Sequence, residues 1–231
     1  MAYRCVATSV AGFLQQLAVA YVAHGYWFYV AGRVPDRKDP AGVDAKLIER
    51  YGIAISKWTR ARRQRAGQAK VQYLRYDRFF VILATHGAHP FFTAEAKRIR
   101  DLRRQPLHFL GYAIGCRKGR DGRRWHPSVR IERGRFRELK ARFTREAVQR
   151  SVEELCRELG TLGYEPYAPV RDQLRGLLRA INHRRQAAGL ELVPRLALRL
   201  HRSPVRPFEE AGNATPGEVV GPTRPEPGSD V

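Results

Sequence analysis

The chain has 231 residues, 43% of them hydrophobic, which excludes a wholly disordered protein and allows one large or two small domains. Its 43 Lys and Arg residues against 22 Asp and Glu give a formal charge of +21. So positive a surface attracts polyanions, nucleic acid first, and no membrane partner is expected because the apolar run 6–22 is interrupted by polar residues. Three scattered cysteines without a CxxC pair and the lack of a signal peptide predict a cytoplasmic protein.

Strand-like and helical stretches alternate along the first half of the chain. The pattern opens as a strand, an amphipathic helix and an aromatic strand. Residues 71–84 are the most strand-like stretch, either one bent strand or a hairpin that turns at Tyr76-Asp77. The expected strands are 4–9, 26–30, 71–84, 107–116 and 128–132.

Helical spacing dominates the second half, where Ser151 and Glu154 form a capping box. The expected helices are 10–23, 41–51, 93–104, 136–149, one from Ser151 to about 160, and 170–188. The predicted fold is therefore α+β: a mixed or antiparallel sheet covered by helices, with a helical C-terminal part and a disordered tail.

Three regions are predicted from these elements: a sheet domain over 1–135, a helical part over 136–207 packed on it, and a tail over 208–231. The tail is rich in Pro and Gly and has five acids against one arginine, a composition that cannot bury a core. Without it, 42 basic and 17 acidic residues remain, a formal charge of +25.

Basic residues gather in three stretches: 57–70, 98–104 and 117–145. The first has six basic residues and no acid, and its Trp58 is expected either to stack on a base or to lie in the core beside a solvated loop. The third has twelve basic residues on a predicted hairpin and helix, which can follow a phosphate backbone or form a solvated face. The candidate nucleic-acid-binding residues are Lys57, Trp58, Arg60, Arg62, Arg63, Arg65, Arg98, Arg103, Arg104, Arg117, Lys118, Arg120, Arg123, Arg124, Trp125, Arg135 and Arg142.

Catalysis is a second hypothesis. His86 and His89 follow a strand and have a side chain that ligates metals, but the two residues between them keep them off one strand face, and no acidic third ligand stands out. A metal-dependent nuclease or strand transferase would use both histidines, Asp77 and a tyrosine nucleophile, Tyr164 or Tyr167. Only this alternative needs a divalent metal, and otherwise no cofactor or metal is expected.

The order of motifs in residues 74–143 resembles the end of the palm and the start of the thumb of group II intron-type reverse transcriptases. The matching stretches are RYDRFFVIL (75–83), FLGY (109–112) and the basic hairpin 117–131. Only Asp77 lies near the position of the paired carboxylates, and the fingers are missing, whereas two metals need at least two carboxylates. The resemblance implies a non-polymerising relative or fragment that kept nucleic-acid binding.

The predicted function is binding of DNA or RNA, in a mobile-element or replication system. The alternatives are the metal-dependent nuclease or strand transferase, and a basic module that binds an acidic protein.

Overall fold

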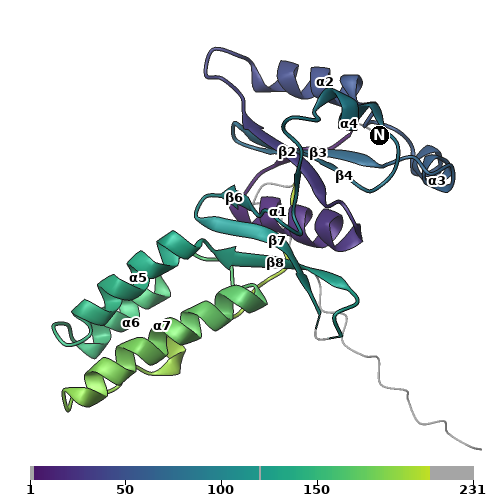
Figure 1. Cartoon of the computed structure of the whole chain (residues 1–231). Coiled ribbons are helices and arrows are strands. Elements are labelled where there is room, and N and C mark those ends of the chain that lie inside the picture. Colours follow the sequence, from purple (N-terminus) through teal and green to yellow (C-terminus); the bar gives the residue numbers. More distant parts are fainter. Residues whose placement is uncertain (1–2, 120, 209–231) are drawn as a thin grey trace, which may run out of the picture.

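The computed structural model describes residues 3–119 and 121–208 and contains two β-sheets (Figure 1). The first has the strand order β1-β3-β4-β2-β5, and the second has the order β6-β7-β8. β1 runs parallel to β3, and the other pairs are antiparallel. The strands are β1 (Val6–Ala7), β2 (Phe28–Arg33), β3 (Val71–Tyr76), β4 (Phe79–Ala84), β5 (Arg100–Asp101), β6 (Leu107–Phe109), β7 (Tyr112–Lys118) and β8 (Trp125–Ile131).

Helices separate and cover these sheets. The first helix lies between the two sheets, α2 and α4 cover the far side of the first sheet, and α5, α6 and α7 form an arm beyond the second sheet (Figure 1). The predicted α+β class is therefore confirmed. The helices are α1 (Val10–Gln15), η1 (Gln16–Tyr21), η2 (Val22–His24), α2 (Pro40–Arg50), α3 (Lys57–Arg65), α4 (Pro90–Ala94), α5 (Arg133–Glu146), α6 (Val152–Gly160), α7 (Ala168–Ala187) and η3 (Arg195–Ala197).

The first helix runs without a break through α1, η1 and η2. It begins at Ser9, whose Oγ accepts a hydrogen bond from the Gly12 N–H at 3.0 Å, and it ends at Gly25 with φ 87°. Its buried side chains, among them Phe13 and Leu17, lie on more than one side of the helix because a sheet packs on each side of it. None of the helices among the described residues is both long and apolar enough to cross a membrane.

Residues 71–84 form the hairpin of β3 and β4 rather than one bent strand. Tyr76 pairs with Phe79, so Asp77 and Arg78 make a two-residue turn, and Asp77 has φ 50°. Val81 and Leu83 face the core shared with the second sheet, whereas Ile82 and Ala84 face α2 and α4. Both faces are buried, which explains the continuous apolar run of β4.

Two expected elements are corrected. Residues 93–104 are not a helix, because α4 ends at Ala94 and β5 pairs with the edge of β2. Glu95 turns the chain there: its buried carboxylate accepts a 2.6 Å hydrogen bond from the Tyr51 hydroxyl, and its carbonyl accepts from the N–H of Arg98 and Ile99. The strand expected over 107–116 is two strands, β6 and β7, joined by a turn at Leu110 and Gly111, both with positive φ.

The end of the described chain packs back on the first helix. The Thr8 N–H donates to the Pro207 carbonyl at 3.1 Å, and the Gln15 side chain accepts from the Val205 N–H at 3.2 Å. Phe208, placed in the tail by the sequence prediction, packs against the core instead, and the rest of the predicted tail, 209–231, lies outside the described residues. One core cluster contains residues of both 1–135 and 136–207, and the division into those two regions stays a prediction.

Gly87 offers a first test of the packing. It has φ 132°, and a Cβ there would lie 2.6 Å from the Ala69 nitrogen and 2.7 Å from the Gly67 carbonyl oxygen, where the two backbones run side by side. Since neither backbone atom can move cheaply, Gly87→Ala is expected to lower the free energy of unfolding by about 3 kcal/mol in urea titrations. Gly134→Ala is the control, because it meets nothing within 4 Å and should cost no stability. Equal stability of both variants would contradict the crowding at Gly87.

Candidate nucleic-acid interface

Leu102 joins the two sheets. Its N–H donates to the Trp27 carbonyl at 2.8 Å, and its own carbonyl accepts from the Cys116 N–H on β7 at 3.0 Å. Gly115 permits this contact, because a Cβ there would lie 2.9 Å from the Leu102 oxygen. The basic segment that the sequence predicts as a helix therefore connects the two sheets, as the short strand β5 followed by a turn over residues 102–104.

One face of the β7–β8 ribbon has small residues at its centre and arginines at its ends. Side chains alternate along a strand, so Gly115 and Arg117 share this face of β7, and Ser128 and Arg130 share it on β8. The opposite face carries Ile114, Val129 and Ile131 into the core. The small residues leave a hollow of about 200 Å³.

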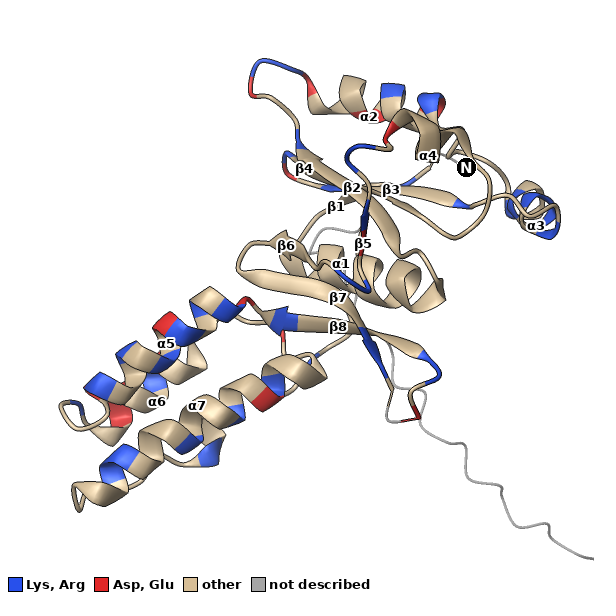
Figure 2. Cartoon of the chain, viewed as in Figure 1, with Lys and Arg blue, Asp and Glu red and all other residues tan. Residues whose placement is uncertain are grey.

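Four arginines surround this hollow, and we call them the basic junction: Arg103, Arg104, Arg117 and Arg130. No carboxylate is among the described residues that line it. Arg104, Arg117 and Arg130 have no ion pair with any described carboxylate, and Figure 2 shows basic residues at β5 and along the β7–β8 ribbon. The structure thus brings two separate basic stretches of the sequence together.

Arg103 and Arg130 differ in charge compensation. Arg103 forms an ion pair with Asp101 at 2.6 Å and lies 4.5 Å above the Trp27 ring. Burial acts to raise the pKa of Asp101, but the Arg103 hydrogen bonds outweigh it and the pKa lies below its usual value. Burial and the neighbouring Arg117 charge lower the pKa of Arg130, and they outweigh the opposing charge of Asp172.

The turn of the ribbon extends the junction. Arg117, Lys118, Arg123 and Arg124 are exposed there, and the Lys118 Nζ lies 5.7 Å from the centre of the Trp125 ring. Arg120 lies outside the described residues. The turn therefore presents basic side chains and a half-buried aromatic ring, which together can contact phosphates and bases.

α3 is the second basic surface. Its Lys57, Arg60, Arg62, Arg63 and Arg65 form no ion pair with a described carboxylate, and none of its residues is buried. Trp58 is 75% exposed, so the expectation that it lies in the core beside a loop is wrong. Figure 2 places α3 at the opposite end of the molecule from α5.

The predicted residues of α5 are partly neutralised. Arg135 pairs with Glu138 at 3.5 Å, and Arg142 pairs with Glu158 at 3.5 Å. Other basic residues of α5, together with Arg184 of α7, line an open groove of about 750 Å³. Arg98 is also paired, with Glu95 at 3.3 Å.

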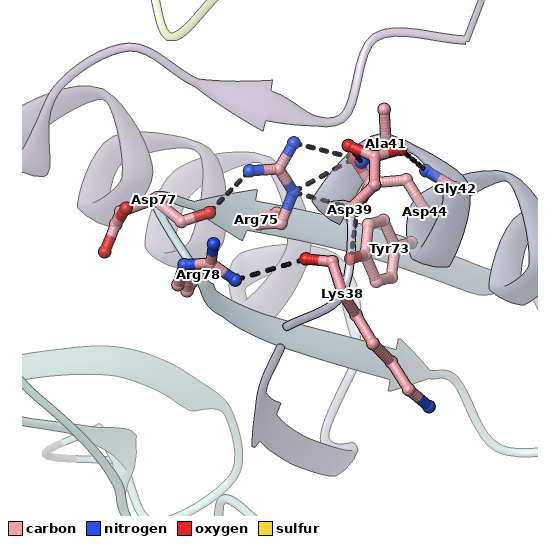
Figure 3. A network of polar contacts seen from close by, with 9 residues as sticks. All are labelled: Lys38, Asp39, Ala41, Gly42, Asp44, Tyr73, Arg75, Asp77 and Arg78. Carbon is pink, nitrogen blue, oxygen red and sulfur yellow. Dashed lines mark hydrogen bonds and ion pairs between the residues drawn. The ribbon is translucent and has the colours of Figure 1, made fainter. Parts of the chain in front are cut away.

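Asp77 has a structural setting in the β3–β4 turn. Its carbonyl accepts a hydrogen bond from Arg75, whose guanidinium also holds the buried carboxylate of Asp44 at 2.8 and 2.9 Å (Figure 3). The neighbouring Arg78 donates to carbonyls of the loop before α2, including that of Lys38 at 3.3 Å (Figure 3). The Asp77 carboxylate is 66% exposed and lies 4.0 Å from Arg33.

The structure does not bring the proposed metal ligands together. Asp77 precedes β4 and His86 follows it, so about 20 Å of strand separates them. His86 is exposed beside the Phe28 ring, whereas the His89 Nδ1 accepts a 3.0 Å hydrogen bond from the Phe91 N–H and caps α4. Within the described part of the chain, no group of three His, Cys, Asp or Glu residues is arranged to hold a metal ion.

The cap at His89 predicts a pH effect on stability. Burial first, then the Arg63 charge, lowers the pKa of His89, so the folded protein favours the neutral ring. A lowered histidine pKa gives stability that is complete above the unfolded value of about 6.5 and is lost as the pH falls. From about pH 7.5 to about pH 5, the wild type should lose more unfolding free energy than His89→Asn, which keeps an N-cap acceptor that does not titrate. Parallel losses in urea titrations would contradict this role.

The candidate nucleophiles pack as aromatic residues. Tyr164 lies edge-on to Tyr112 with ring centres 5.4 Å apart, and the Arg202 guanidinium lies 4.4 Å from the Tyr167 ring centre. Burial raises the pKa of Tyr167 to about 12, the opposite of what activates a nucleophile.

The candidate list left out Ser128 and also Arg130, although Arg130 lies in the predicted basic stretch 117–145. The available signal was the alternation of β8, which places both on the face opposite Val129 and Ile131. The pairing of that face with Arg104 came from tertiary structure alone.

Comparisons of the chain with protein-family models, curated proteins and solved structures found no match. The resemblance to reverse transcriptases stays a prediction.

Proposed function

We propose that the protein binds nucleic acid, with the phosphate backbone held at the basic junction. The observation that carries the proposal is the convergence of Arg104, Arg117 and Arg130 around one hollow whose described lining contains no carboxylate. Arginine presents a planar fork of donors that fits phosphate oxygens, so clustered, uncompensated arginines favour a polyanionic partner.

The neighbouring ribbon turn supports the same partner. Its exposed arginines continue the positive surface beyond the hollow, and Trp125 adds an aromatic ring within reach of a base. α3, with five unpaired basic residues and the exposed Trp58, is a second contact surface in this proposal.

The test is the salt dependence of binding. Fluorescence anisotropy with labelled duplex and single-stranded DNA and RNA should give affinities that fall steeply between about 50 and about 200 mM salt, since each phosphate contact releases counterions. A logarithmic slope of about −4 or steeper is expected from the junction and the ribbon turn together. Absence of binding to all four probes at low salt would reject the proposal.

A further inference from the structure

A second basic cavity lies on the other side of the segment that carries the junction. Gln105 and Leu107 line this cleft, whereas Arg104 and Pro106 line the junction. The cleft has a volume of about 550 Å³, within the usual range for small-molecule sites. It lies between β2, β5 and β6.

Every side chain of the cleft that can carry a charge near neutral pH is basic. They are Lys97, Arg98, Arg100 and His108. Arg98 is neutralised by Glu95 at 3.3 Å, and the His108 Nδ1 lies 3.2 Å from Glu132. Lys97 and Arg100 form no ion pair with a described carboxylate, so two positive charges remain uncompensated.

The rest of the wall is apolar or neutral. Ala31 and Phe79 contribute apolar surface, and the Tyr29 hydroxyl is fixed by donating to the Pro106 carbonyl at 3.0 Å. A ligand that matches this cleft therefore has about two negative charges and a small flat or apolar part.

We propose that the cleft binds a phosphate monoester, the group carried by a mononucleotide or by the phosphorylated end of a strand. A monoester has a charge of about −1.5 to −2 near neutral pH, which matches Lys97 and Arg100, whereas an internal phosphodiester carries only one. Guanidinium and ammonium donors form charge-assisted hydrogen bonds to its oxygens. The apolar wall receives a base or a sugar.

The test begins with free ligands in calorimetric titrations. Inorganic phosphate and adenosine monophosphate should bind, and adenosine should not. Lys97→Gln/Arg100→Gln should weaken both by about tenfold or more, because each substitution removes a charge-assisted bond. Lys46→Gln/Arg179→Gln removes two exposed charges elsewhere and should leave the affinity unchanged.

Oligonucleotides with a 5′-phosphate or a 5′-hydroxyl separate the two sources of the monoester. If the phosphorylated strand binds more tightly and Lys97→Gln/Arg100→Gln removes the difference, the ligand of the cleft is the end of a strand. If both strands bind equally and adenosine monophosphate also binds, the ligand is a free nucleotide. Failure of the wild type to bind either phosphate or adenosine monophosphate would overturn the proposal, as would equal affinities of the two double variants. The 5′-hydroxyl strand has no monoester for the cleft and reports on the surfaces of the proposed function, so failure here leaves that function standing.

Discussion

Replacing the three uncompensated arginines of the basic junction, Arg104→Gln/Arg117→Gln/Arg130→Gln, is expected to weaken nucleic-acid binding about a hundredfold at low salt. Glutamine keeps much of the side-chain length but removes the charge and the donor fork. The slope of log affinity against log salt should become shallower by about 2.7, since about 0.9 of a counterion is released per phosphate contact.

Overall charge must be separated from location in this experiment. Lys46→Gln/Arg179→Gln/Arg195→Gln removes the same number of positive charges from exposed sites away from the junction. This control should lose only the small part of the affinity that comes from the long-range field, and its salt slope should be nearly that of the wild type. Equal losses in both triple variants would mean that charge alone, without a site, holds the ligand.

The second large effect is expected at Asp44. Its buried carboxylate accepts hydrogen bonds from the Arg75 guanidinium and a 2.5 Å bond from the Tyr73 hydroxyl (Figure 3). The Arg75 side chain is only 11% exposed. Asp44→Ala leaves that charge buried without its partner, so the free energy of unfolding should fall by about 3 to 5 kcal/mol.

The double variant Asp44→Leu/Arg75→Met separates the cost of an unpaired buried charge from the packing that the two side chains contribute. Replacing both charges by apolar groups removes the unpaired charge, so stability should recover part of what Asp44→Ala loses, whereas the buried Tyr73 hydroxyl lacks its acceptor in both variants. Chemical denaturation of the two variants and the wild type measures this. A loss below about 1 kcal/mol in Asp44→Ala would show that Arg75 finds other partners and that the network does not hold α2 to the sheet.

Local signals predicted much of the fold. The Ser151 capping box is present, with Glu154 donating its N–H to the Ser151 Oγ at 3.2 Å and its carboxylate accepting from the Ser151 N–H at 2.9 Å. The ribbon of β7 and β8 and the glycine that ends the first helix were also predictable, because turns and caps depend on residues close in the sequence.

Long-range contacts explain the errors. The sequence of residues 93–104 has helical spacing. The backbone of this segment instead forms hydrogen bonds with the edge of β2 and with the Trp27 carbonyl. From sequence, Asp44 is a solvated residue of an amphipathic helix. In the structure Arg75, 31 positions away, binds its carboxylate. Spacing likewise suggested chemistry at His86 and Asp77, which the strand between them keeps apart.

The candidate site was likewise predicted only in its local features. Sequence identified the basic stretches that contain Arg104 and Arg117, since charge density is a local property. It gave no means to see that the two meet over Gly115 and Ser128, because that depends on how Leu102 joins the sheets.

Crosslinking of a bound oligonucleotide, followed by mass spectrometry of the peptides, tests the nucleic-acid interface most directly. Crosslinks are expected in the peptides that contain Arg104 and the ribbon residues 117–130, with weaker ones at Trp58. Crosslinks confined to the α5–α7 arm, or none at low salt, would contradict it.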